Sequence, residues 1–142
     1  MADKKYSVAF DAVITKLAGA IPALVDIVQY PNQPPRIKGS ATTKQPSSEN
    51  WIRLSLIPTA STNVATGGGQ TWVRRNGLIV VDVFTPKGTS LSANQSICDD
   101  ITTLFENTEF GNVKTFEAST AKIEDDPWLG YQVTINFYCE GL

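Results

Sequence analysis

The chain has 142 residues, a formal net charge of −2, 42% hydrophobic residues and no histidine. This length is typical of one domain, and the hydrophobic fraction is that of an ordinary globular chain. Because histidine is absent, mechanisms that use imidazole as a base, proton shuttle or metal ligand are excluded, among them Ser-His-Asp and Cys-His catalysis.

The charge is distributed unevenly along the chain. Up to residue 90, ten basic residues stand against five acidic ones, and after it two basic residues stand against nine acidic ones. The first part is therefore +5 and the second −7. Two interpretations are open: solvated faces that differ by chance, or a surface with a basic side and an acidic side. The second suits head-to-tail self-association, in which two different patches meet.

The chain begins with an expected helix. Over residues 4–19, the side chains of Tyr6, Phe10, Val13 and Leu17 are spaced four, three and four positions apart. This spacing is typical of an amphipathic helix, and the glycine and proline that follow are expected to end it.

The next segments predict a short strand and a loop. Residues 24–30 are mostly apolar and precede a Pro-Asn pair, which indicates a short strand or an extended arm. Residues 32–49 are rich in Pro, Ser and Thr and nearly free of large apolar side chains. They predict a mobile loop.

Two strands with a loop between them are expected in the middle of the chain. Residues 51–57 alternate apolar and polar side chains, which predicts a half-buried strand ended by Pro58. Residues 59–71 are polar and contain three consecutive glycines, so they predict a second mobile loop. Residues 72–85 resume as a long strand, and residues 78–84 are apolar at both parities, as in a central strand covered on both faces.

The last third of the chain predicts a helix and two strands. Apolar residues recur at helical spacing over residues 91–105, and a short strand is plausible over residues 113–118. Residues 131–140 alternate strictly, which predicts a strand with one core face and one polar face. The expected fold is a single α+β domain over residues 1–142, a mainly antiparallel sheet of about four to five strands packed by two helices.

One charged residue interrupts the apolar central strand. Asp82 must be exposed, paired or protonated there, because an unpaired buried charge is costly. We expect it to meet an arginine rather than to act in catalysis.

The two cysteines do not indicate a redox or zinc site. Cys98 and Cys139 are 41 positions apart and form no C-x-x-C pair. Both lie at apolar-periodic positions, which predicts buried free thiols in a reducing compartment. Without an apolar signal region or a run of roughly 18 apolar residues, neither secretion by a signal peptide nor a membrane partner is expected.

No cofactor or metal site is predicted. The glycines at residues 67–69 are not followed by G-K-[ST], so they do not match a phosphate-binding loop. The acidic residues 124–126 lack the alternating ligand spacing of a calcium loop, and they predict a solvated turn instead.

Trp72, Arg74 and Arg75, together with Arg53, are the constellation of basic and aromatic residues in the sequence. Such residues stack on bases and contact phosphates in nucleic-acid-binding proteins. The same residue types are enriched at protein interfaces. Because three arginines in an otherwise acidic chain are a weak basis for nucleic-acid binding, the sequence favours a protein interface, and direct nucleic-acid recognition is not expected.

Several short motifs resemble one known family. They are IVQYPNQPP at residues 27–35, WIRLSLIP at residues 51–58, an R-x-G followed by an apolar strand that closes in Phe-Thr-Pro over residues 75–86, and an alternating strand that begins at Trp128. With the N-terminal amphipathic helix and the later helix, these motifs resemble the tail terminator and minor tail proteins of long-tailed bacteriophages. The resemblance spans nearly the whole chain.

The resemblance implies a structural role rather than an enzymatic one. It implies a head-to-tail ring, expected to be hexameric, that caps the tail tube and presents a surface for head-tail joining. The implied partners are other copies of the chain, the tail tube protein and a head completion or connector protein. The implied location is the head-proximal end of the virion tail, with assembly in the host cytoplasm.

The residues expected at interfaces with other copies or with the tube are Arg53, Trp72, Arg74, Arg75, Asp82, Asp125, Asp126 and Trp128. Four other functions remain open at this point: a head completion or connector protein, a tail tube protein, a nucleic-acid-binding module and a metal-dependent hydrolase.

Overall fold

The computed structural model describes residues 3–20, 25–37, 40–125 and 127–142. The elements in chain order are α1 (Tyr6–Ala20), β1 (Ile27–Gln29), β2 (Arg36–Ile37), β3 (Trp51–Gly67), β4 (Gln70–Pro86), α2 (Leu91–Phe105), β5 (Glu109–Phe110), β6 (Val113–Asp125) and β7 (Trp128–Gly141).

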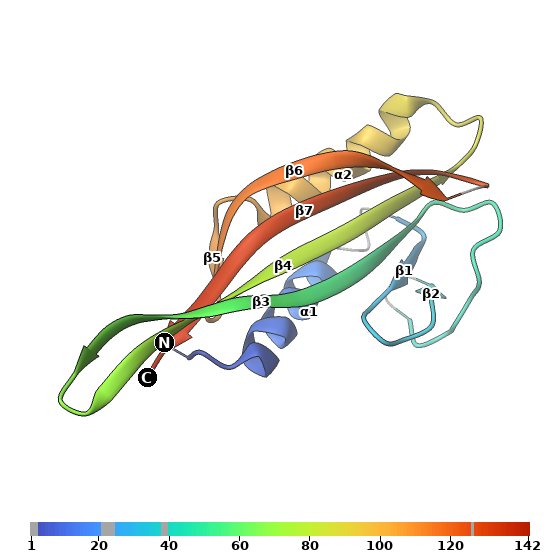
Figure 1. The fold of residues 1–142 in the computed structure, drawn as a ribbon. Helices are drawn as coiled ribbons and strands as arrows, with labels where there is room; N and C mark the ends of the chain where they lie inside the picture. The colour runs from blue at the N-terminus through green and yellow to red at the C-terminus, as the bar shows by residue number, and fades with distance from the viewer. Residues whose placement is uncertain (1–2, 21–24, 38–39, 126) are drawn as a thin grey trace.

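The strands of the described residues form one twisted sheet of seven strands in the order β2-β1-β3-β4-β7-β6-β5 (Figure 1). β1 pairs with β3 in parallel, and the other neighbours pair antiparallel. The α+β class and the two helices are therefore confirmed, but the expected sheet of four to five mainly antiparallel strands is wrong. The sheet is larger because it includes β2 and β5, which with two residues each are too short to leave a periodic signal, and it is mixed because β1 runs parallel to β3.

The expected loop over residues 59–71 is also wrong, because these residues form most of a long β-hairpin. β3 and β4 continue through this segment and pair as far as Gly67 and Gln70, with Gly68 and Gly69 at positive φ in the turn. From residue 57 to residue 70 every side chain is exposed. The hairpin projects beyond the helices at one end of the sheet (Figure 1).

Both helices pack on the same face of the sheet. Every fourth residue of α1 is buried there, and α2 contributes a second apolar row. These rows meet the inward side chains of β3, β4 and β7, which include Ile52, Leu54, Ile79, Val81, Val83, Val133, Ile135 and Phe137. The alternation of β7 is thus confirmed as core on one parity.

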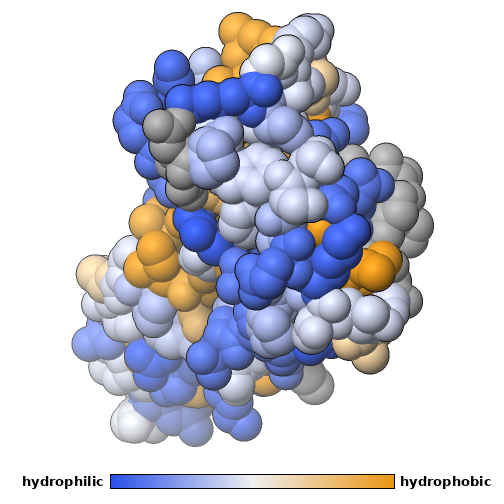
Figure 2. Space-filling view, turned by 90° about the vertical axis from the view of Figure 1, so that its right-hand side faces the viewer, coloured by the Kyte–Doolittle hydropathy of each residue, from blue (hydrophilic) through white to orange (hydrophobic). Residues whose placement is uncertain are grey.

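The face of the sheet opposite the helices, the open face, carries the other parity of β3, β4 and β7. Val80, Asp82 and Phe84 on this face are nevertheless buried, because neighbouring side chains cover them. The apolar residues 78–84 are therefore covered on both faces, as predicted. Figure 2, which views the molecule from the right-hand side of Figure 1, shows hydrophobic side chains in separate patches between polar surface. Neither helix of the described residues is long and apolar enough to cross a membrane.

Candidate assembly surface

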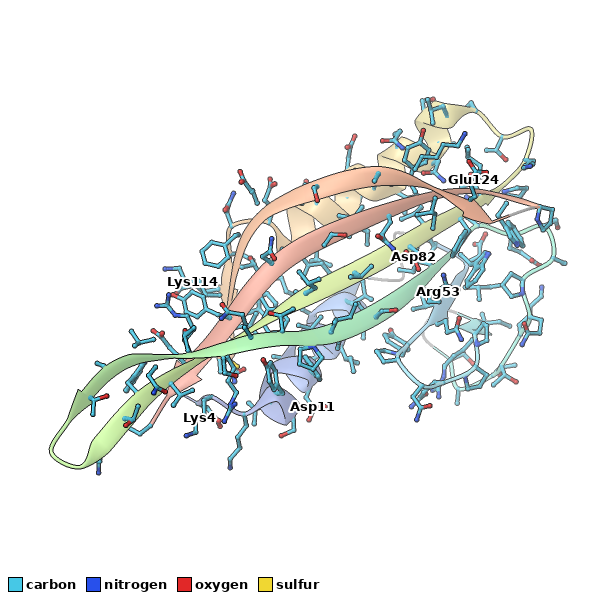
Figure 3. The ribbon with its side chains drawn as sticks, viewed as in Figure 1. Lys4, Asp11, Arg53, Asp82, Lys114 and Glu124 are labelled. Carbon is cyan, nitrogen blue, oxygen red and sulfur yellow. The ribbon has the colours of Figure 1, made fainter. Side chains whose placement is uncertain are left out.

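Three neighbouring strands bring one ionic cluster together on the open face. Arg53 on β3, Asp82 on β4 and Gln132 on β7 lie in one row of the sheet. Arg53 donates from Nε and Nη2 to Asp82 Oδ2 at 3.0 and 2.8 Å, and Gln132 Nε2 donates to Asp82 Oδ1 at 2.9 Å. The prediction that Asp82 meets an arginine is confirmed. Figure 3 shows the two labelled side chains facing one another.

Aromatic rings adjoin this cluster and cover its end of the open face. The ring of Trp51 stacks on Phe84 at 4.4 Å between centroids and meets Trp128 edge-on at 6.0 Å. The Arg53 guanidinium lies 5.2 Å from the centroid of Phe84 and 5.9 Å from that of Trp51. Ile27 and Ile123 complete the cluster. An arginine beside stacked rings gains both cation–π attraction and the ion pair.

Trp72 and Arg74 lie on the open face at the other end of β4, near the base of the hairpin. Arg74 Nε donates to Glu140 Oε2 at 2.9 Å, and its guanidinium lies 4.1 Å from the ring centroid of Tyr138. Eight positions of strand separate Arg74 from Asp82, which is about 26 Å at ~3.3 Å per residue. Arg53 and Arg74 therefore belong to two separate clusters.

Arg75 lies on the helix face, because successive side chains of a strand point to opposite sides. Its Nη1 donates to Ser61 Oγ at 3.1 Å, and its guanidinium lies 6.0 Å from the ring centroid of Tyr6 on α1. The expected constellation of Trp72, Arg74, Arg75 and Arg53 is thus not brought together on one surface.

The expected acidic partners are described only in part. The backbone of Asp125 pairs with Trp128 at the turn between β6 and β7, whereas the side chain of Asp125 and the whole of Asp126 lie outside the described residues. The predicted solvated turn over residues 124–126 is wrong in part: Glu124 is exposed, but Glu124 and Asp125 belong to β6 and pair with Leu129 and Trp128 of β7.

Sequence reasoning missed the partners that complete both clusters, namely Trp51, Phe84, Gln132, Tyr138 and Glu140. Part of the signal was present. The even-numbered residues of β7 were identified as a polar face, so Gln132, Tyr138 and Glu140 were candidates once the strand order was known.

Both cysteines are buried and free, as predicted. Burial, with a smaller contribution from the Asp99 carboxylate, raises the pKa of the Cys98 thiol to about 11. Burial also raises the pKa of Cys139, against the opposing effect of Arg75. In the part of the chain that the structure describes, no three His, Cys, Asp or Glu residues group closely enough to hold a metal ion.

The sequence matches the model of a family described as phage tail terminator protein over residues 11–137. The chain belongs to this family. It is therefore a structural protein of the phage virion, located in the tail, and its family is not a class of enzymes. No curated protein sequence matches the chain.

Two solved structures share the fold of this tail terminator family member. One, a protein without a descriptive name, aligns with a TM-score of 0.64 at 16% identity and covers 99% of this chain and 98% of its own. The other is a chain from the virion of a native gene transfer agent particle. It aligns with a TM-score of 0.55 at 14% identity over 96% of this chain and 100% of its own.

Charged residues of both signs lie toward each end of the sheet in this tail protein, with Glu140 beside Arg74 near the hairpin base and Lys122 near Glu124 on β6. Figure 3 places Lys4 near the base of the β3–β4 hairpin and Glu124 at the far end. The N-terminal segment is held at the hairpin base, because Cys139 Sγ lies 3.5 Å from the Lys4 carbonyl and Tyr6 Oη donates to Asn76 O at 2.5 Å. The interpretation of a basic side and an acidic side therefore stays a prediction.

Proposed function

We propose that this tail terminator family member assembles head to tail into a ring of six copies, caps the tail tube and presents a joining surface to the head connector. The observation that carries the proposal is the family match, which extends over residues 11–137. The partners in this proposal are other copies of the chain, the tail tube protein and a head completion or connector protein.

The uneven charge along the chain, +5 up to residue 90 and −7 after it, supports head-to-tail association. Lys4 lies near the hairpin base, and Glu124 lies near the opposite end of the sheet. An interface that joins different patches generates a ring when the rotation closes, and its lateral edges are then consumed within the ring. Growth can then stop at the two faces, as capping requires.

Two segments are suited to reach neighbouring copies or the tube end. The β3–β4 hairpin is exposed over residues 57–70, and residues 40–49, within the predicted loop 32–49, are mainly irregular and exposed. We assign contacts with other copies or the tube to these two segments, together with Trp72, Arg74 and the expected acidic residues 125 and 126. Arg75 faces the helices, so its contact would belong to a different side of the copy.

Electron microscopy of the purified protein, alone and mixed with tail tubes, tests this function. The expected images are closed rings and tubes with an added density at one end only. Tubes of unlimited length from the protein alone would instead indicate a tube protein. Rings that bind the head connector and ignore tube ends would indicate a connector protein, and either result would overturn the capping role.

A further inference from the structure

Two stretches of strand edge in this sheet have no partner strand in the described residues. β1 pairs with β3 only at residues 51–53, so the outer edge of β3 over residues 57–67 is open. β5 pairs with β6 only at Val113 and Lys114, and the turn that follows α2 binds the β6 backbone as far as Ala118. The outer edge of β6 over residues 119–124 is therefore open as well.

The β3 edge carries no charged side chain against strand pairing. Natural edge strands carry charged side chains, prolines or a covering segment, because their unpaired N–H and C=O groups are a template for another strand. Pro58 and the register shifts between Pro58 and Ser61 and between Asn63 and Ala65 protect this edge in part. Residues 59–67 contain no charge, and Val64 is 48% exposed among Ser, Thr, Ala, Asn and Gly. The hairpin end of the sheet thus exposes an uncharged strand edge that a strand of another copy can pair with.

We propose that the outer edge of β3, residues 57–67, pairs antiparallel with the outer edge of β6, residues 119–124, of a second copy of this chain. The pairing rests on the proposed ring and specifies its interface.

The topology sets the direction of this pairing. Three antiparallel steps, through β4 and β7, separate β3 from β6, so the two edge strands run in opposite directions within one copy. When neighbouring copies in the ring have their helices on the same side of the sheet, β6 of one copy therefore lies antiparallel to β3 of the next. Because the open edges lie at opposite ends of the strands, the strands would run obliquely to the ring axis, as they do in closed barrels.

The Glu124 carboxylate favours this partner over a second β3 edge. In the antiparallel arrangement the end of β6 that carries Lys122 and Glu124 points to the base of the hairpin on the second copy, near which Lys4 lies. The opposite end, at Ser119, points to the uncharged hairpin tip. If two β3 edges paired with each other instead, the hairpin base of each copy would face the hairpin tip of the other. Residues 57–67 carry no acidic group that could meet Lys4 there.

Cysteine cross-linking tests the pairing. Thr62→Cys on β3 is mixed with Ser119→Cys, Thr120→Cys or Ala121→Cys on β6, all exposed positions, and the mixtures are oxidised. Paired strands place opposite Cα atoms about 4.5 to 5.5 Å apart, within reach of a disulfide. The buried thiols of Cys98 and Cys139 leave little background. The matched control is Thr103→Cys on the exposed side of α2.

The proposal expects a disulfide-linked species of two copies, about 31 kDa from 15.4 kDa each, only in a mixture of one β3 and one β6 variant. Links in a single variant alone, or in none of the mixtures while the protein has the mass of a ring, would overturn the edge pairing and leave the ring intact. Absence of any assembly by mass would overturn the proposed ring and the pairing with it. Links in an open polymer would support the pairing and contradict the capping role.

Discussion

Arg53 and Asp82 face each other across β3 and β4, with guanidinium Nη2 2.8 Å from carboxylate Oδ2. The two side chains differ in exposure, at 39% for Arg53 and 6% for Asp82. The carboxylate therefore depends on Arg53 and Gln132 for the hydrogen bonds that water would otherwise supply, whereas the guanidinium retains part of its hydration.

Replacing the buried Asp82 should therefore destabilise the fold more than replacing the acidic partner of a more exposed ion pair. Asp82→Ala leaves Arg53 and the Gln132 amide without their acceptor, and we expect a loss of about 2 kcal/mol in the free energy of unfolding. Urea denaturation measures it. The matched control is Glu140→Ala, which breaks the ion pair with Arg74 in a more exposed setting of 35% and 28%. It should cost less than about 1 kcal/mol, and an equal loss in both variants would contradict this account.

Gly77 is required by the ring of Phe137, its partner on β7. A Cβ at Gly77 would lie 2.6 Å from two ring carbons of Phe137 and 3.0 Å from the Ile57 carbonyl oxygen. Because Phe137 is buried under α1, Gly77→Ala should destabilise the fold by about 1 to 3 kcal/mol, the usual cost of overpacking. Gly67→Ala, where a Cβ meets nothing within 4 Å, is the control for thermal melting. Equal melting temperatures for both variants would refute the steric argument.

The thiols of the folded protein should be unreactive at pH 8. Burial raises the pKa of both cysteines, that of Cys98 to about 11, so little thiolate forms at either position and access is restricted. Labelling with iodoacetamide should modify the urea-unfolded protein at both positions and leave the folded protein largely unmodified, as read by mass spectrometry. Modification of the folded chain at the rate of a free cysteine would show that the burial is wrong.

The carboxyl group of Glu49, in the segment between β2 and β3, should take up its proton at a lower pH than an ordinary glutamate does. Lys44 Nζ lies 2.6 Å from Glu49 Oε1, and the N–H groups of Ser47 and Ser48 donate to Oε2. The Lys44 contact and these backbone bonds lower the pKa of the Glu49 carboxyl from 4.5 to about 2.

A lowered carboxyl pKa stabilises the folded segment above the unfolded value of 4.5, and this contribution is lost as the pH falls toward about 2. In carboxyl ¹³C NMR, Glu49 should titrate near 2, and Lys44→Met should move its pKa back toward 4.5. A wild-type titration already at 4.5 would mean that the contacts do not form in solution.

The strands with a buried face were predictable, and the exposed ones were not. Residues 131–140 alternate strictly because one side packs against helices, so the pattern records the burial. The hairpin over residues 59–71 faces water on both sides, and its polar sequence is the same as that of a loop. Its pairing comes from strand neighbours rather than from a local pattern. The parallel contact of β1 with β3 is likewise a long-range relationship that no local periodicity reports.

The residues expected at interfaces were likewise predictable only in part. Burial made it possible to predict that Asp82 meets an arginine, but the choice of Arg53 required the register of β3 on β4. The expectation that Arg74 and Arg75 lie on one surface was wrong, although their adjacent positions in a predicted strand were enough to separate them. Adjacent residues of a strand point to opposite faces, and Arg75 accordingly meets Tyr6 on the helix side.

The molar mass of the purified protein by multi-angle light scattering, across a range of concentrations, tests the central claim most directly. A closed ring of six copies of 15.4 kDa predicts a plateau at about 92 kDa that rises no further with concentration. Thr62→Lys, which places a charge on the open β3 edge, should shift the population toward the monomer. A mass of 15.4 kDa at every concentration, or one that grows without a plateau, would contradict a self-closing tail terminator ring.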